Sequence, residues 1–125
     1  MILDTCAILW LAGGGGKLSE DALRKIETSP FVYISAISGF EISLKYKNGK
    51  LELPVSPNVW FSVILKHHNI SVIPLNIDIC IAANELPFIH KDPCDRFIIA
   101  TAKKHNFPVV TGDSLFKEYG IEVIS

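Results

Sequence analysis

Three acidic residues lie at or just beyond short apolar runs that are typical of buried strands. Asp4 closes the opening run MILD, Asp113 follows VVTG, and Glu41 lies in the helical segment that leaves FVYIS. Active sites of open parallel sheets form beyond the carboxyl ends of the strands, so these carboxylates are expected at one edge of one sheet. Asp4 and Asp113 can each also cap the helix that follows, and a capping position at this edge does not exclude a functional role.

Glu41 lies on a side of its segment that we expect to face inward. Apolar residues at helical spacing, Ile37, Phe40 and Leu44, form a stripe that includes its position. An unpaired carboxylate on that side would be strongly unfavourable. Lys45 offers the alternative of an ion pair four residues on, which contributes about 0.3–0.5 kcal/mol on a helix surface. An inward glutamate near the start of a helix favours contact with a cation.

The segment HKDPCDRF carries two aspartates three residues apart. Proline is favoured at the first position of a helix, so Pro93 makes Asp92 the N-cap and Asp95 the third helical residue. Helical spacing from Asp95 leads to the face expected to pack on the sheet, which carries Ile98, Ile99 and Ala102. The spacing therefore predicts a structural role for Asp92 and a functional role for Asp95.

Asp4, Glu41, Asp95 and Asp113 are thus expected to converge at one edge of the sheet. Carboxylates that lie so close together repel one another and raise one another's pKa values. A divalent cation removes this repulsion. Ligation by oxygen alone favours Mg²⁺ or Mn²⁺ over zinc. Cations held in this way activate water and stabilise the leaving oxygen in phosphodiester cleavage. The four residues therefore predict a metal-dependent phosphodiesterase or nuclease, in which they are both the metal ligands and the catalytic residues.

The composition excludes several other classes of protein. The net charge is −1, so any nucleic acid must be held by a local basic patch or through metal ions. The three cysteines include no C-x-x-C pair, which argues against a disulfide framework and a structural zinc site. No apolar run approaches the roughly 20 residues that span a bilayer, and the opening lacks a basic segment. We expect a soluble cytoplasmic protein of one domain, with no membrane partner.

Short β-branched runs alternate with helical segments along the chain. Strands are expected over residues 2–4, 31–34, 71–74, 108–111 and 121–124. Helices are expected over residues 5–11, 19–28, 36–48, 59–68, 77–86 and 93–105, with a short one over 114–117. This alternation predicts an α/β protein whose parallel sheet is covered on both faces. The glycines at 13–16 are interpreted as a flexible break between helical segments, and no phosphate-loop motif follows them.

Four blocks, in this order and spacing, resemble PIN-domain proteins, and specifically the VapC-type toxin ribonucleases of toxin–antitoxin pairs. The blocks are ILDTCAILW, ISAISGFEISLKYKNGKLELP, HKDPCDRFIIATAKKHNFPVVTGD and the closing strand. The resemblance covers residues 1–125 and implies a single PIN domain. It also implies a three-layer α/β/α sandwich with a central parallel sheet, an acidic Mg²⁺ or Mn²⁺ site, and endonucleolytic cleavage of RNA.

The resemblance assigns roles to individual residues by motif position. The family's acidic residues match Asp4, Glu41, Asp95 and Asp113. Small hydroxyl residues beside the acids match Thr5 and Thr111, which are expected to donate hydrogen bonds to the ligands. The chain departs from the family at Cys6, where a histidine is usual, and at Cys94, where a phenylalanine is usual. Both positions adjoin expected ligands, so the departures leave the expected activity in place.

The resemblance also implies partners: an RNA substrate, a cognate antitoxin that covers the acidic site, and a second copy in a homodimer. Basic residues expected near the site are candidates for RNA contacts, namely Lys45 and Arg96, with Lys47, Lys50 and Lys91. An ordinary solvated face explains these charges equally well. Two other functions stay open, a housekeeping PIN nuclease and a non-catalytic interaction module with an acidic cluster. A phosphoacceptor receiver domain is disfavoured, because Asp4 lacks the acidic neighbour which that fold carries after its first strand.

Overall fold

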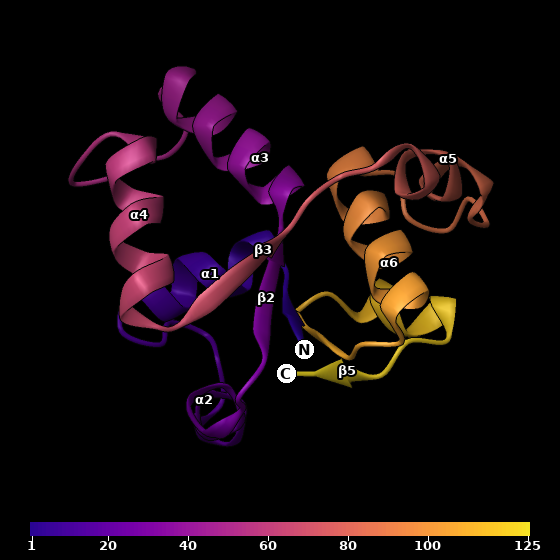
Figure 1. Cartoon of the computed structure of the whole chain (residues 1–125), viewed down its shortest axis with the longest axis horizontal. Coiled ribbons are helices and arrows are strands. Elements are labelled where there is room, and N and C mark those ends of the chain that lie inside the picture. The colour runs from indigo at the N-terminus through magenta and orange to yellow at the C-terminus, as the bar shows by residue number, and fades with distance from the viewer.

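Five parallel strands form one sheet at the centre of the molecule (Figure 1). The computed structural model describes all residues from Met1 to Ser125. The sheet has the order β3-β2-β1-β4-β5, and its strands are β1 (Ile2–Leu3), β2 (Val32–Ser35), β3 (Ile70–Ile73), β4 (Val109–Val110) and β5 (Val123–Ile124). The chain leaves β1 toward β2 and β3 and later returns to its other side, so the strand order reverses at β1. Ligand sites of such sheets lie at this reversal.

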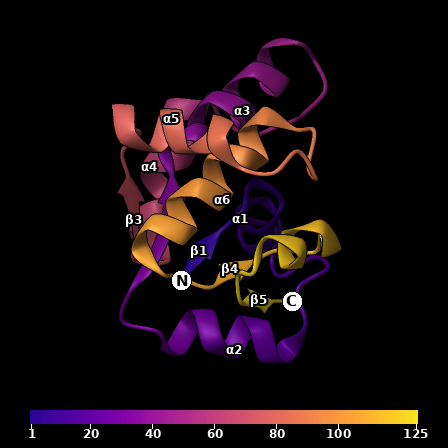
Figure 2. The same ribbon diagram turned by 90° about the vertical axis from the view of Figure 1, so that its right-hand side faces the viewer.

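Helices cover both faces of the sheet, which confirms the predicted three-layer α/β/α architecture. They are α1 (Thr5–Ala12), α2 (Glu20–Thr28), α3 (Ala36–Lys47), α4 (Pro57–His67), α5 (Ile77–Glu85), α6 (Pro93–His105) and the 3₁₀ helix η1 (Ser114–Tyr119). In Figures 1 and 2, α2 lies at the end of the molecule opposite α3 and α5. No helix combines the length and the apolar character needed to cross a membrane.

Alternate residues of the strands supply two separate hydrophobic cores. Leu3, Ile34 and Val110 point to one face, where they join buried residues of α1, α2 and α4. Ile2 and Val109 point to the other face, where they join buried residues of α6 and η1. Because successive side chains of a strand point to opposite faces, even the two-residue strands β1 and β4 contribute to both cores. This explains why the strands read as continuous apolar runs in the sequence.

The observed elements match the expected ones in kind and differ at their ends. Helix α4 begins two residues earlier than expected, with Pro57 at its first turn. The short helix after Asp113 is a 3₁₀ helix that continues to Tyr119. Strands β4 and β5 each pair over only two residues. Helix α6 begins at Pro93 and ends at His105, as predicted.

Helix α3 buries a different face from the expected apolar stripe. Phe40 is 57% exposed and Leu44 is 43% exposed, whereas Ile37, Ser38 and Ile42 are buried. The predicted stripe was therefore wrong, although Ile37 belongs to both faces. Apolar residues occur on both sides of this helix, so periodicity could not show which side the sheet covers.

The glycine run at Gly13–Gly16 lies between α1 and α2, as expected, and forms a hydrogen-bonded turn. The Gly15 amide donates to the Trp10 carbonyl oxygen at 2.8 Å. Gly16 has a φ of 49°, and a Cβ there would lie 2.8 Å from the Trp10 side chain. A Cβ on Gly112, on the far side of the same ring, would lie 2.9 Å from it. Two glycines are therefore needed to seat the Trp10 ring beside the carboxyl edge of the sheet.

Candidate metal centre

A pocket of about 250 Å³ opens at the carboxyl edge of the sheet, beside the end of β1. It is lined by Asp4, Thr5, Cys6, Trp10, Glu41, Lys45, Asp92, Asp95, Gly112 and Asp113. The structure thus brings together the four carboxylates that the sequence pattern selected. They come from four separate segments, because the carboxyl ends of parallel strands and the helices that follow them meet at this edge.

Asp4 lies at the floor of the pocket and also caps α1. Its Oδ1 accepts a hydrogen bond from the Ala7 amide at 2.8 Å, and the residue is 5% exposed. Burial is the main cause that raises the pKa of Asp4, and the charges of Asp113 and Glu41 raise it further. Hydrogen bonds from the Thr111 hydroxyl and the Ala7 amide act in the opposite direction.

Glu41 extends from α3 toward the same pocket, with only 13% of its side chain exposed. Its Oε2 forms an ion pair with the Lys45 Nζ at 3.2 Å. Its Oε1 is buried and has no hydrogen-bond partner. Burial lowers the pKa of Lys45, but the charge and hydrogen bond of Glu41 outweigh burial and raise it overall. The inward orientation of Glu41 is confirmed, and Lys45 satisfies only one of its two oxygens.

The two aspartates of HKDPCDRF have the separate positions that the helix register predicted. Asp92 caps α6, and its Oδ1 accepts a hydrogen bond from the Cys94 amide at 2.9 Å. Asp95 lies in the first turn of α6 and faces the pocket. Burial raises the pKa of Asp95 to about 7, the charges of Asp92, Asp4 and Glu41 add to this, and His90 opposes it. A proton or a cation is therefore favoured at Asp95.

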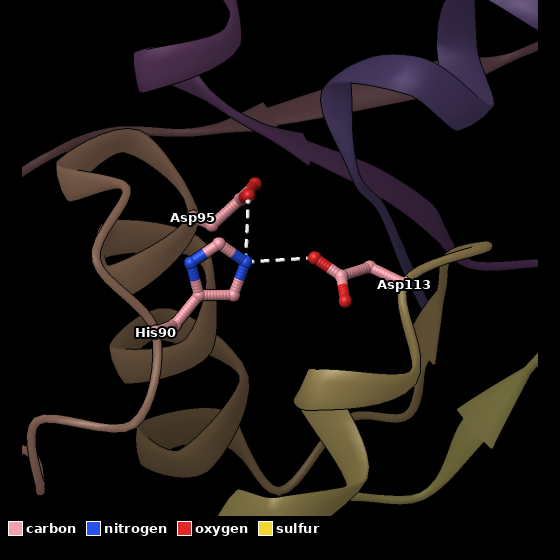
Figure 3. Close-up of side chains that lie close together, drawn as sticks. All are labelled: His90, Asp95 and Asp113. Carbon is pink, nitrogen blue, oxygen red and sulfur yellow. Dashed lines mark hydrogen bonds and ion pairs between the residues drawn. The ribbon is translucent and has the colours of Figure 1, made fainter.

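His90 is part of the site, although the sequence pattern did not select it. Its Nε2 lies 2.7 Å from Asp113 Oδ2 and 3.1 Å from Asp95 Oδ2 (Figure 3). One ligand atom of each of these three residues lies within 4.8 Å of the others. In the sequence, His90 lies two residues before the capping Asp92. Its position in the pocket could not be predicted, because the sequence does not show which way the loop before α6 turns.

Asp113 closes the pocket from the loop between β4 and η1. Its Oδ1 caps η1 by accepting a hydrogen bond from the Leu115 amide at 2.9 Å. Its own amide donates to the Thr111 hydroxyl at 3.0 Å, so Thr111 helps to hold the loop that carries Asp113. Thr5 has a different partner from the one expected, because its hydroxyl pairs with the Ser38 hydroxyl at 3.0 Å and joins α1 to α3.

Arg96 is buried, which corrects the expectation that it contacts RNA phosphates or solvent. The residue is 7% exposed, and its guanidinium donates hydrogen bonds to the carbonyl oxygens of Ala83, Leu86, Pro87 and His90. The guanidinium carbon also lies 5.3 Å from the centre of the Phe88 ring. The planar fork of arginine suits several carbonyl oxygens at once. Arg96 therefore holds the loop between α5 and α6, and Lys45 is the basic residue that lines the pocket.

Comparison with known proteins assigns the family. The PIN domain family model matches residues 1–122. The ribonuclease VapC22 of Mycobacterium tuberculosis is 26% identical over 120 residues, which cover 95% of this chain and 91% of that protein.

Two solved structures share the fold over nearly the whole chain. FitAcB from Neisseria gonorrhoeae has a TM-score of 0.67 and 21% identity, with 99% of this chain and 96% of that chain covered. VapBC2 from Rickettsia felis, bound to a DNA fragment from its promoter, has a TM-score of 0.70 and 18% identity, with coverages of 98% and 95%. With this fold and with a family match from the first residue to residue 122, the chain belongs to the PIN domain family.

Proposed function

We propose that this PIN domain is a metal-dependent endoribonuclease and the toxin of a toxin–antitoxin pair. The observation that carries the proposal is the convergence of Asp4, Glu41, Asp95 and Asp113 on one pocket, with a buried oxygen of Glu41 left without a partner. The similarity to ribonuclease VapC22, and to structures of VapBC and FitAcB, supports the ribonuclease and toxin assignments.

A divalent cation fits the donor set of this pocket. Five carboxylates, the four predicted ones and the capping Asp92, share the pocket with one basic side chain, Lys45. Burial raises the pKa values of Asp4 and Asp95, which means that the charged form of each carboxylate is disfavoured. A bound cation would stabilise the charged form. Apart from the thiol of Cys6, the metal donors on this surface are oxygens, which favours Mg²⁺ or Mn²⁺. Asp4, Glu41, Asp95 and Asp113 would hold the cation, which supplies activation of water and stabilisation of charge at the cleaved phosphate.

The protein residues position the substrate and the ligands. Asp4, Asp92 and Asp113 each cap the helix that follows them, and the caps orient their side chains at the carboxyl edge. The Lys45 side chain is 45% exposed and lies on the pocket wall, where its ammonium group can contact an incoming phosphate. The pocket is small and open to solvent at the molecular surface, which suits a single phosphodiester of a flexible RNA strand.

Substitution of the ligands tests the proposed activity. Asp4→Asn and Asp95→Asn should each reduce metal-dependent RNA cleavage by at least about 100-fold, because each removes a charge that holds the cation. Circular dichroism checks that both variants stay folded. Asp78→Asn is the matched control, because that side chain is 81% exposed and pairs only with Lys104. Cleavage at the wild-type rate by a folded Asp4→Asn or Asp95→Asn variant would refute the assignment.

Further measurements distinguish a toxin from the two alternatives, a non-catalytic module and a housekeeping nuclease. A non-catalytic module with an acidic cluster would bind no Mn²⁺ in a calorimetric titration at millimolar concentration. A housekeeping nuclease would cleave RNA without arresting growth when the chain is expressed alone. The toxin assignment predicts growth arrest by the wild type, none by Asp95→Asn, and rescue by the protein encoded beside it.

Exposed apolar surface supports the expected protein partners. A groove of about 620 Å³ lies between α1, α4 and the segment before α4, and Val55, Val59 and Val63 line it with 42–56% exposure. Elsewhere, Phe40 on α3 and Ile77 on α5 are 57% and 73% exposed. Apolar surface of this kind marks contacts with partners. We assign these surfaces to the antitoxin and to a second copy of the chain, and gel filtration with and without the antitoxin tests both.

A further inference from the structure

His90 has no assigned part in the proposed chemistry, yet it lies between two of the carboxylates. We infer that His90 is a positioning residue whose Nε2–H is donated to Asp113 and holds it beside Asp95, and that it is not itself a ligand of the cation. The inference rests on the proposed metal site. It matters because a histidine among three carboxylates would otherwise be taken for a nitrogen ligand.

The hydrogen bonds of the ring determine which nitrogen carries the proton. The Asp92 amide donates to His90 Nδ1 at 3.1 Å, so Nδ1 is an acceptor and carries no hydrogen. A neutral imidazole with an unprotonated Nδ1 carries its hydrogen on Nε2. This hydrogen is donated to Asp113 Oδ2, 2.7 Å from Nε2, and Asp95 Oδ2 lies 3.1 Å from the same nitrogen without a hydrogen bond (Figure 3). A nitrogen that bears a hydrogen has no lone pair to give to a metal ion.

The alternative tautomer would conflict with the backbone. For Nε2 to bind a cation, the hydrogen would have to move to Nδ1, where it would face the Asp92 amide. Two donors would then meet inside the protein, and a buried donor without an acceptor costs about 1–3 kcal/mol. Asp92 cannot turn its amide away easily, because it is the N-cap of α6 and precedes Pro93. The cap of α6 therefore selects the donor tautomer.

The loop that carries His90 is held on both sides. The Tyr119 hydroxyl accepts a hydrogen bond from the His90 amide at 2.7 Å and donates one to the Pro87 carbonyl at 2.8 Å. Arg96 donates to the carbonyl oxygens of both Pro87 and His90 at 3.2 Å. The imidazole, in a residue only 8% exposed, meets the Phe116 ring edge-on with 5.8 Å between ring centres. These contacts place the ring nitrogens independently of any cation.

The Nε2–H of His90 reduces the repulsion between the carboxylates of Asp95 and Asp113. Asp95 comes from α6 and Asp113 from the loop before η1, so no local structure holds the two carboxylates together. Their charges repel, and the Nε2–H that is donated to Asp113 and lies close to an oxygen of Asp95 opposes their separation. Asp113 Oδ1 already caps η1, so the second oxygen of Asp95 is the one without a hydrogen bond. His90 thus keeps the ligands near the spacing that one cation needs before the cation binds.

Mn²⁺ binding by the full chain, measured by calorimetry, tests the positioning role. His90→Ala should weaken Mn²⁺ binding by about 10–100-fold, the usual effect of losing a group that orients metal ligands. His90→Gln should stay within about 3-fold of the wild type, because its amide donates from nearly the same place and is a poor metal ligand. His105→Gln, at the exposed far end of α6, is the control and should bind as the wild type does.

Two spectroscopic readouts do not depend on activity. Ring-nitrogen chemical shifts of the metal-free wild type should show the Nε2–H tautomer for His90. Electron spin echo spectra of bound Mn²⁺ should show no directly bonded nitrogen. A bonded nitrogen that disappears in His90→Gln, an Nδ1–H tautomer, or unchanged Mn²⁺ affinity in His90→Ala would each overturn the inference. Absence of Mn²⁺ binding by the wild type would instead refute the metal site, and the chemical shifts of the metal-free chain would still decide the tautomer.

Discussion

The two walls of the acidic pocket satisfy their carboxylates in different ways. The histidine wall consists of His90, Asp95 and Asp113, and there the ring Nε2–H is donated to Asp113 and lies close to an oxygen of Asp95. The lysine wall consists of Glu41 and Lys45, and there an ion pair contacts one oxygen while the other is buried without a partner. The histidine wall is thus held by hydrogen bonds before any cation binds, whereas the lysine wall contains an unsatisfied acceptor.

This difference separates positioning from binding. Buried polar atoms without a partner are rare in folded proteins, because each costs about 1–3 kcal/mol. The unpaired Glu41 oxygen is therefore evidence that a cation binds at the lysine wall. The hydrogen bonds of the histidine wall give no such evidence. We expect substitutions on the lysine wall to affect cation binding directly and those behind the histidine wall to affect it through geometry.

The largest effect on activity is expected for Glu41→Gln on the lysine wall. The amide keeps the shape of the side chain but loses the charge, so RNA cleavage should fall by about 100–1000-fold. The free energy of unfolding should stay the same or rise, since a buried charge is removed. Steady-state cleavage and urea unfolding measure the two quantities. A large fall in stability would show that Glu41 has a structural role and would remove the contrast between the walls.

Arg96→Ala should cause the largest loss of stability, because it removes the support behind the histidine wall. Four carbonyl oxygens lose their shared donor, and the free energy of unfolding should fall by about 3–5 kcal/mol. Arg96→Lys should recover only part of this loss, because an ammonium group cannot reach the same set of acceptors. Urea unfolding of both variants checks the order. Equal stability of Arg96→Ala and wild type would mean that the loop carrying His90 is held by other contacts.

The stability of the metal-free protein should fall as the pH rises from about 4 to about 7. Burial raises the pKa of Asp95 from 3.8 to about 7, so in this range the folded chain binds a proton that the unfolded chain has released. Asp95→Asn should flatten this fall. Allowing for solvent screening of a partly exposed group, it should be more stable than wild type at pH 8 by about 1 kcal/mol, or about 3–6 °C in Tm.

Thermal unfolding in the presence of a chelator, at pH 4.5 and at pH 8, measures this prediction. Mn²⁺ should restore the stability of wild type at pH 8 and should have little effect on Asp95→Asn, because a cation replaces the proton on Asp95. A wild-type stability that rises steadily between these pH values in the chelator would contradict the stated sign.

The smallest effect is expected for Lys45→Gln. The lysine is 45% exposed, and an ion pair four residues along a helix contributes about 0.3–0.5 kcal/mol, so stability should barely change. Cation binding should tighten by about 2–5-fold because a competing charge leaves Glu41, whereas KM for RNA should rise because a phosphate contact is lost. Calorimetry and cleavage kinetics separate these effects. Lys47→Gln, outside the pocket, serves as the control.

Several features of the site could be predicted because they depend on neighbouring residues. Pro93 sets the start of α6, and this start alone separates the capping Asp92 from the pocket-facing Asp95. Asp4 and Asp113 follow apolar runs whose parallel pairing brings strand ends to one edge. The inward orientation of Glu41 was predicted correctly, but from the wrong stripe, because α3 carries apolar residues on both its buried and its exposed sides.

Other features depend on contacts between distant segments. Arg96 follows a pocket residue and would be expected at the surface, yet the end of α5 supplies one acceptor for its guanidinium and the loop after α5 supplies three. His90 lies in a loop without a periodic pattern, and its part in the site depends on its hydrogen bond to Asp113, 23 residues away. The glycine turn likewise depends on a distant contact, because the Trp10 side chain occupies the space that a side chain on Gly16 or Gly112 would need.

The sequence by itself determined the α/β order, the capping residues and the four carboxylates, because strand runs, helix starts and strand-end acids are local patterns. Only the tertiary structure decided which hydrogen bonds those carboxylates make. The histidine wall exists because the loop before α6 folds back over Arg96 and Tyr119, and the unsatisfied oxygen of Glu41 exists because α1 and α3 bury it beside Asp4. Burial and long-range pairing set the energy of a charge, and neither is written in the spacing of residues along the chain.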